Sequence, residues 1–351
     1  MSTKLGRHIP ALLAAFLMAA FTFGCSPKQR RQQPLAFWPS PPAPPRIALL
    51  RTVSGSADFQ QRPGFFESLG KVILGPRKHN LLRLQGVAVH DDQCLYVTDL
   101  ELQGVHLFNF HSSKSSFIDR AGKVFFVSPV AVAVCDDRIA VADSVLKKVF
   151  LLKPDGKLQN TLEKPGGFER PTGLAFDPEA KLIYVVDTLA NEVCVFELSG
   201  RFLRRFGSPG REPGQFNYPT YVFVDNTGRV YVTDSLNFRV QVFDRQGRFL
   251  FDIGELGDAS GYLAVPKGVG VDSFGNIYVV DSRFSVVQVY DQQGRFLLAF
   301  GGPGDKAGAF QVPSGLTVDT SNRIFVCDSY NSRVQIFQYI GTDDEEASSN
   351  R

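Results

Sequence analysis

Short apolar segments that each end in aspartate recur along most of this chain. A clear example is Tyr231-Val232-Thr233-Asp234, and five similar segments end at other aspartates. The six residues are Asp99, Asp143, Asp187, Asp234, Asp281 and Asp328, and neighbours in this series lie 44 or 47 residues apart. A fixed period of this length, built from short strands, is typical of β-propeller blades.

The fourth repeat shows the unit most clearly. Its alternation of apolar and polar positions predicts strands over residues 219–225, 230–233, 240–243 and 248–251. Gly228 and Gly247 lie in the first and last turns, where a residue with positive φ is needed. Four antiparallel strands make one blade, so the six repeats predict an all-β fold: a six-bladed β-propeller of four-stranded antiparallel blades over residues 46–340.

The way the ring closes can also be predicted. The last repeat stops after its third strand at residues 333–337, whereas residues 46–54 resemble an isolated fourth strand. We expect residues 46–54 to pair beside residues 333–337, so that an N-terminal strand completes the last blade. Residues 56–83 then form a longer segment that leads into the first blade.

The N-terminus resembles a secretion signal over residues 1–24. Lys4 and Arg7 precede an apolar stretch over residues 11–23, which is shorter than a bilayer-spanning helix requires. Residues 21–25 resemble the lipobox of bacterial lipoproteins, which implies lipidation of Cys25; Ser26 then favours the outer membrane. Plain secretion with an unmodified Cys25 is the alternative.

Two segments outside the repeats have unusual compositions. Residues 25–45 are rich in proline, which predicts an extended spacer between the lipid and the propeller. Residues 341–351 are acidic, and we expect them to form a disordered tail. The net charge of the whole chain is only +3, with no long basic run, so the composition argues against a nucleic-acid partner. We expect a monomeric propeller.

Several segments closely match the repeat of the NHL family. They are residues 239–244 (RVQVFD), 266–272 (PKGVGVD) and 275–281 (GNIYVVD). The resemblance covers about the last 270 residues and is most specific in repeats four to six. It implies a six-bladed propeller that binds a protein or another ligand. Lactonases and the peptide-amidating lyase share this architecture, and their chemistry needs metal ligands near the central channel.

The six repeated aspartates are better explained by structure than by catalysis. One active site needs an asymmetric set of residues, whereas a carboxylate at each strand end can accept backbone N–H groups and fix the following loop. The innermost strands offer no ionisable residue before their ends, and histidine is scarce. We therefore predict no catalytic residues, no metal and no cofactor. The open alternative is a metal-dependent lactonase, hydrolase or lyase, using Asp99, Asp143 or Asp187 with Glu101.

One end of the propeller departs most from the repeat. Aromatic and arginine side chains, which protein interfaces favour, cluster in the loops there. The predicted partner face consists of Tyr221, Phe238, Arg239, Tyr262, Arg283, Phe284, Tyr330 and Arg333. The first hypothesis is a membrane-anchored scaffold that docks another envelope or exported protein. A glycan-binding module is a further alternative, and packing of these loops on one another would explain the same residues.

Overall fold

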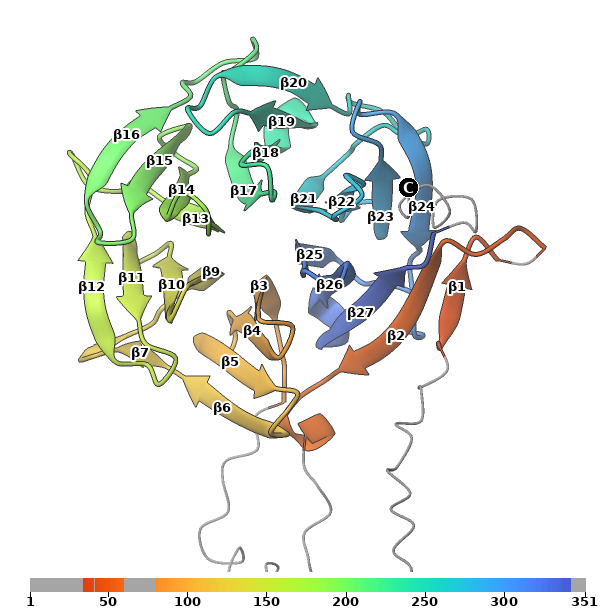
Figure 1. The fold of residues 1–351 in the computed structure, drawn as a ribbon, viewed down its shortest axis with the longest axis horizontal. Coiled ribbons are helices and arrows are strands. Elements are labelled where there is room, and N and C mark those ends of the chain that lie inside the picture. Colours follow the sequence, from red (N-terminus) through yellow and green to blue (C-terminus); the bar gives the residue numbers. More distant parts are fainter. Residues whose placement is uncertain (1–33, 41, 60–79, 342–351) are drawn as a thin grey trace, which may run out of the picture. The chain divides into compact units, whose positions relative to one another are not determined.

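The structure is a computed structural model that describes residues 34–40, 42–59 and 80–341 (Figure 1). The described residues form one compact unit. The predicted signal peptide, Cys25 and the acidic tail after Gly341 lie outside the described residues. Within the described part of the chain, no helix is long and apolar enough to cross a membrane.

Six antiparallel sheets surround a central axis as blades (Figure 1). Blade one contains β3 (Leu84–His90), β4 (Cys94–Asp99), β5 (Gly104–Asn109) and β6 (Lys114–Ile118). Blade two contains β9 (Pro129–Cys135), β10 (Arg138–Asp143), β11 (Lys148–Leu152) and β12 (Leu158–Leu162). Blade three contains β13 (Pro171–Asp177), β14 (Leu182–Asp187), β15 (Glu192–Glu197) and β16 (Phe202–Phe206).

The remaining blades follow the same order. Blade four contains β17 (Pro219–Val224), β18 (Val230–Asp234), β19 (Arg239–Phe243) and β20 (Phe249–Ile253). Blade five contains β21 (Pro266–Val271), β22 (Ile277–Asp281), β23 (Val286–Tyr290) and β24 (Phe296–Gly301). Blade six contains β25 (Pro313–Val318), β26 (Arg323–Asp328), β27 (Arg333–Tyr339) and β2 (Ile47–Val53). The predicted six-bladed architecture is therefore confirmed.

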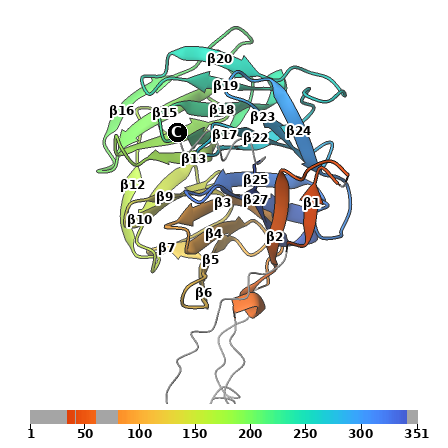
Figure 2. The same cartoon turned by 45° about the vertical axis from the view of Figure 1, so that its right-hand side comes forward.

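The N-terminal strand closes the ring as predicted. β2 pairs antiparallel with β27, placing Leu49 opposite Phe337 and Val53 opposite Val334. We expected residues 25–45 to be an unpaired spacer, but Ala36–Trp38 form β1, a fifth strand on the outer side of β2 (Figure 2). The Trp38 indole packs on Phe300 and Phe337 of blades five and six, and this burial explains why the short strand forms in a proline-rich segment.

The hydrophobic core lies between the blades. The middle strands are buried on both faces, so they appear in the sequence as continuous apolar runs such as residues 139–142 of β10, all fully buried. One core cluster joins Ala131 and Ala133 of blade two to Leu174 and Ile183 of blade three. Each large aliphatic side chain buried in this way contributes roughly 1.5–3 kcal/mol to folding, so neighbouring blades stabilise one another.

Short extra elements connect the blades. A small hairpin of β7 (Arg120–Ala121) and β8 (Val124–Phe125) lies between blades one and two. The structure also contains three single 3₁₀ turns. η1 (Ser56–Phe59) lies beside β5 and β6, η2 (Ser235–Asn237) beside β19, and η3 (Ser329–Asn331) beside β27. Part of the predicted lead-in to blade one, residues 60–79, lies outside the described residues.

Candidate functional site

Two sets of loops meet at one end of the propeller. They are the loop that precedes the first strand of each blade and the loop between its second and third strands. A backbone N–H of the second loop donates to a carbonyl of the first, as from Thr188 to Arg170 at 3.0 Å and from Tyr330 to Gln311 at 3.1 Å. We call this end the loop face. The opposite end, with the turns between strands one and two, is the turn face.

The repeated aspartates hold these two loops together. Asp143 is fully buried, and its carboxylate accepts the N–H groups of Val127 and Ser128 from one loop and of Val145 and Leu146 from the other, at 2.7–3.1 Å. All six aspartates are fully buried. Four residues after each one, φ lies between +52° and +58° in every blade, and Phe238 occupies this left-handed position in blade four. These carboxylates are committed to the backbone.

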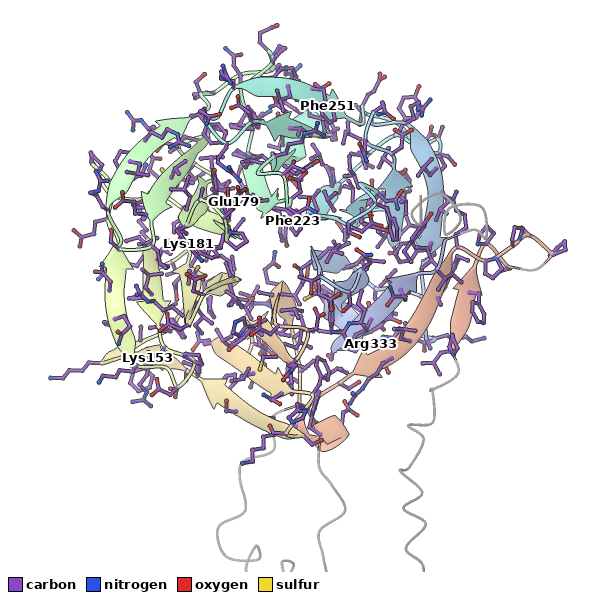
Figure 3. All side chains as sticks on the ribbon, in the orientation of Figure 1. Lys153, Glu179, Lys181, Phe223, Phe251 and Arg333 are labelled. Carbon is purple, nitrogen blue, oxygen red and sulfur yellow. The ribbon has the colours of Figure 1, made fainter. Side chains whose placement is uncertain are left out.

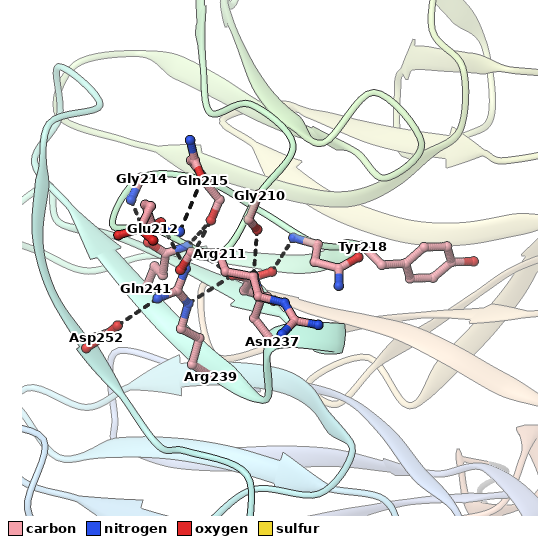
Figure 4. A network of polar contacts seen from close by, with 12 residues as sticks. Gly210, Arg211, Glu212, Gly214, Gln215, Tyr218, Asn237, Arg239, Gln241 and Asp252 are labelled. Carbon is pink, nitrogen blue, oxygen red and sulfur yellow. Dashed lines mark hydrogen bonds and ion pairs between the residues drawn. The ribbon is translucent and has the colours of Figure 1, made fainter.

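Arginine reinforces this arrangement in blade four (Figure 4). The Arg239 side chain, 11% exposed, places Nε 3.0 Å from a carboxylate oxygen of Asp234. Its Nη2 donates to the carbonyl groups of Arg211, Glu212 and Gln215 at 2.8–3.2 Å. Arg239, predicted on the partner face, therefore holds the loop that precedes its own blade.

Arg333 makes the same contacts in blade six. Its Nε lies 2.7 Å from Asp328, and its guanidinium donates to the carbonyl groups of Asp305, Lys306 and Ala309 at 2.7–2.9 Å. Asn331 also bonds to Asp328, as Asn237 does to Asp234. The paired Asn and Arg of the repeat thus build the loop face.

Other blades use different partners for the same aspartate. In blade one, Nε2 of the buried His106 lies 3.4 Å from Asp99. Burial tends to raise the pKa of Asp99, but hydrogen bonds from His106 and three backbone N–H groups outweigh it and lower the pKa to about 2. In blade three, the Lys164 ammonium lies 2.9 Å from Asp187 and 2.6 Å from Glu192. The sequence pattern did not reveal these partners, because they come from different repeat positions.

Among the described residues, blade five has no arginine side chain that contacts the repeated aspartate and holds the preceding loop; we call this arrangement in blades four and six the arginine clamp. Val286 begins β23, where Arg239 and Arg333 begin the corresponding strands of their blades. In the loop before β21, Leu256 is 63% exposed and Tyr262 is 39% exposed. Arg283 is also exposed, whereas Phe284 is half-buried. This is the most irregular part of the loop face, and it contains three residues of the predicted partner face.

Exposed apolar side chains encircle the loop face. The second residue after the repeated aspartate is apolar and exposed in four blades: Val145, Leu189, Leu236 and Tyr330, at 50–66% exposure. Glu101 and Arg283 occupy this position in the other two blades. Beside them, the loops before the first strands expose Leu82, Val127, Val265 and Val312. We call these eight residues the apolar ring. Sequence analysis identified only Tyr330, although the recurrence of aliphatic residues at one repeat position signalled the others.

The inner strands surround a central channel. Its pocket has a volume of about 150 Å³ and is lined by uncharged residues of five inner strands: 86–89, 131–134, 173–176, 221–224 and 315–317. Tyr221, predicted on the partner face, lies in this channel. Its hydroxyl accepts a hydrogen bond from Gln85 Nε2 at 2.5 Å, across the ring from blade four to blade one. Phe223 lies at the inner margin of the ring (Figure 3).

One ionisable residue of an inner strand escaped the sequence analysis. β21 begins at Pro266 and includes Lys267, which is half-buried. Burial lowers the pKa of its ammonium group. In residues 34–40, 42–59 and 80–341, no three His, Cys, Asp or Glu side chains form a group that could hold a metal ion.

Three family models match parts of the chain. The NHL repeat matches residues 310–337, a 6-bladed β-propeller model matches residues 225–297, and the SMP-30/gluconolactonase/LRE-like region matches residues 116–253. A gluconolactonase from Zymomonas mobilis is 28% identical over 130 residues, which cover 34% of this chain and 36% of that protein. The matched region thus spans about a third of that relative's length.

Solved structures share the fold at low identity. A protein of unknown function from Bacteroides thetaiotaomicron has a TM-score of 0.58 and 16% identity, covering 74% of this chain and 70% of its own. A virginiamycin B lyase from Staphylococcus aureus has a TM-score of 0.54 and 14% identity, covering 74% and 95%. Hydrazine synthase from Kuenenia stuttgartiensis has a TM-score of 0.54 and 13% identity, covering 77% and 99%. At these identities the similarity concerns the fold alone.

Proposed function

We propose that this NHL-repeat six-bladed β-propeller is a non-catalytic scaffold that docks another envelope or exported protein through its loop face. The apolar ring is the observation that carries this proposal. Exposed aliphatic and aromatic side chains at one end of the molecule, recurring from blade to blade, form the kind of patch that marks a protein interface.

The charges beside the ring fit a protein partner. Arg83, Lys147 and Arg170 are exposed next to it, and so are Glu101 and Glu169. Such a mixed pattern lacks the one-sided positive potential that nucleic acid requires. Large apolar side chains rimmed by both signs of charge resemble the core and rim of a protein interface.

The state of the carboxylates supports binding rather than chemistry. A metal-dependent hydrolase needs carboxylates that are free to bind its ion. The six repeated aspartates are instead buried under backbone N–H groups, and the channel pocket is lined by uncharged residues. We further propose that a lipid on Cys25 holds the propeller at the bacterial outer membrane, so that the loop face meets its partner at that surface.

The test is a crosslinking pull-down of the intact protein from its own membranes, followed by reconstitution with the purified partner. The test variant changes Leu189, Leu236 and Tyr330 to Ser. These side chains are exposed, so the fold is retained, and we expect about 100-fold weaker binding because each truncation removes at least 1 kcal/mol. Recovery of a partner that binds the variant equally well would contradict the proposal.

Phe274→Ser is the matched control. Phe274 is 49% exposed but lies in the first turn of blade five, on the turn face. It removes one large exposed apolar side chain from the opposite end of the molecule, a smaller surface than the three changes of the ring variant. Equal losses of partner binding in the control and the ring variant would show that non-specific hydrophobic adsorption, rather than the loop face, holds the partner.

A lactonase-like enzyme is the second candidate. The match of residues 116–253 to the SMP-30/gluconolactonase/LRE-like region favours it. The direct test is hydrolysis of aldonolactones by the purified protein, with and without added Ca²⁺ or Zn²⁺. Turnover that disappears with a chelator, and that the ring variant retains, would replace the scaffold with this function.

A further inference from the structure

Blade four fills the channel differently from the other blades. The third position of the inner strand is Gly86, Ala131, Gly173, Gly268 or Gly315 in the other five blades. A Cβ atom there faces the next inner strand: on Gly86 it would lie 2.9 Å from the Ala131 Cα, and on Gly173 it would lie 2.7 Å from the Thr220 carbonyl oxygen. Blade four nevertheless carries Tyr221 at this position.

A second departure from the repeat meets the first. Gln85 occupies the second position of the inner strand in blade one, opposite blade four, and its amide donates to the Tyr221 hydroxyl. Both residues lie near the loop-face end of their strands, because every inner strand runs from the loop face to the turn face. Tyr221 and Gln85 therefore form a cap across that end of the channel.

Below this cap the channel forms a cup. Its lining extends from the level of Tyr221 to the level of Val89, Val134 and Phe176 near the turn face. These three side chains are half-buried, so that end is accessible to solvent. The cup is therefore accessible from the turn face, whereas the hydrogen bond between Gln85 and Tyr221 crosses its loop-face end.

We propose that this cup binds a small, uncharged molecule about the size of a benzene ring that combines apolar surface with a hydrogen-bonding group. Its volume of about 150 Å³ matches that of an apolar cavity that holds benzene, about 150 Å³. Valine and alanine methyl groups and the rings of Phe176 and Phe223 provide apolar contacts.

The polar groups of the cup fit a ligand with one hydroxyl. Thr317 lies in the lining, and each inner strand pairs on one side only, so its other edge can offer backbone N–H and C=O groups. A carboxylate or ammonium would lose its hydration without gaining a charged partner in this lining, so the cup selects against ions.

The experiment measures 4-fluorophenol binding to the full chain by ¹⁹F NMR titration. Val134→Phe is the test variant because Phe176 shows that the repeat accepts phenylalanine at this position, and because the added ring would fill the open end. We expect saturable binding to the unmodified chain and at least tenfold weaker binding to the variant. Leu250→Phe adds a ring on the exposed outer strand of blade four, and it should leave binding unchanged.

Two further measurements keep the test decisive. Phe223→Ala enlarges the cup and should improve 2-naphthol binding relative to 4-fluorophenol, even if Val134→Phe fails to fold. Benzoate, of similar size but charged, should not bind. Absence of saturable 4-fluorophenol binding, equal binding by Val134→Phe, or benzoate binding of similar strength would overturn the proposal. None of these outcomes depends on the apolar ring, so a failure of this proposal would leave the proposed docking function unaffected.

Discussion

The repeated aspartate is conspicuous in the sequence, but the side chain that faces it differs between blades. Arg239 and Arg333 contact their aspartates from the start of a third strand, whereas His106 lies two residues further along its strand. Lys164 comes from a preceding loop. A buried carboxylate requires hydrogen-bonding or charged partners, and different blades supply them from different positions of the repeat.

Asp99 should make the stability of the protein depend on acid pH. Its folded-state pKa of about 2 lies below the unfolded value of about 3.9, so its contribution is complete above pH 5 and disappears as the pH falls toward 2. Between pH 5 and 2, we expect the unmodified chain to lose about 2 kcal/mol more unfolding free energy than Asp99→Asn, as measured by urea unfolding.

The exposed Asp137 supplies the control for this measurement. Asp137→Asn removes a carboxylate from a surface turn, and its stability profile should follow that of the unmodified chain across the acid range. If the unfolding free energies of the unmodified chain and Asp99→Asn changed in parallel with pH, the His106 and backbone contacts would not lower the pKa of Asp99.

Residue placement was the weakest part of the sequence analysis, and Tyr221 shows why. An aromatic residue where other blades carry glycine indicates a special position, but the pattern does not say whether the side chain points to solvent or toward the axis. That direction depends on how closely neighbouring inner strands approach, which is a property of the assembled ring. For the same reason Arg239 and Arg333 could be identified as unusual, but not as internal clamps.

At the scale of elements, the strands were predictable and the loops were not. Strands recur with the same apolar pattern in six copies, so each copy supports the others. β1 was missed because proline-rich sequence disfavours strand pairing, while the packing that offsets this comes from Phe300 and Phe337, far away in the chain. Tertiary contacts, rather than local propensity, create that strand.

A substitution can introduce the arginine clamp into blade five. In Val286→Arg, the guanidinium would begin β23 as Arg239 begins β19, within reach of Asp281 and the carbonyl groups of the loop before β21. A charged hydrogen bond is worth about 1.5–3 kcal/mol, so amide exchange over residues 255–264 should slow at least tenfold, measured by mass spectrometry.

Val286→Lys is the matched control for the clamp. It adds the same charge but lacks the planar fork that donates to several carbonyl groups at once, so its effect should be clearly smaller. If neither variant slows exchange, the loop before β21 has a different conformation from its counterparts in blades four and six.

At the scale of the molecule, the pairing of β2 with β27 joins the N-terminal and C-terminal strands and completes the last blade of the ring. Ala48 and Gln338 lie opposite each other in this pair. Opposed residues of antiparallel strands are separated by about 4.5–5.5 Å between Cα atoms, a distance that a disulfide can bridge. Ala48→Cys combined with Gln338→Cys should therefore raise the unfolding free energy by about 2–4 kcal/mol when oxidised.

Thermal unfolding in the presence and absence of a reductant measures this effect. The single variant Ala48→Cys separates any cost of substitution from the gain of the crosslink. An oxidised double variant with the melting temperature of its reduced form would show that opening of the seam does not contribute to unfolding.

The short strand β1 gives the seam a mechanical property. Its pairs with β2 run from Ala36–Leu49 to Trp38–Ile47, so the chain enters at the open end of this hairpin. Tension applied before Pro34 therefore peels β1 away first, starting at Ala36. Freed residues 34–46 then extend by about 40 Å before the force reaches β2. β1 therefore detaches before the strand that closes the ring, and its extension takes up the first displacement when the N-terminal segment is pulled.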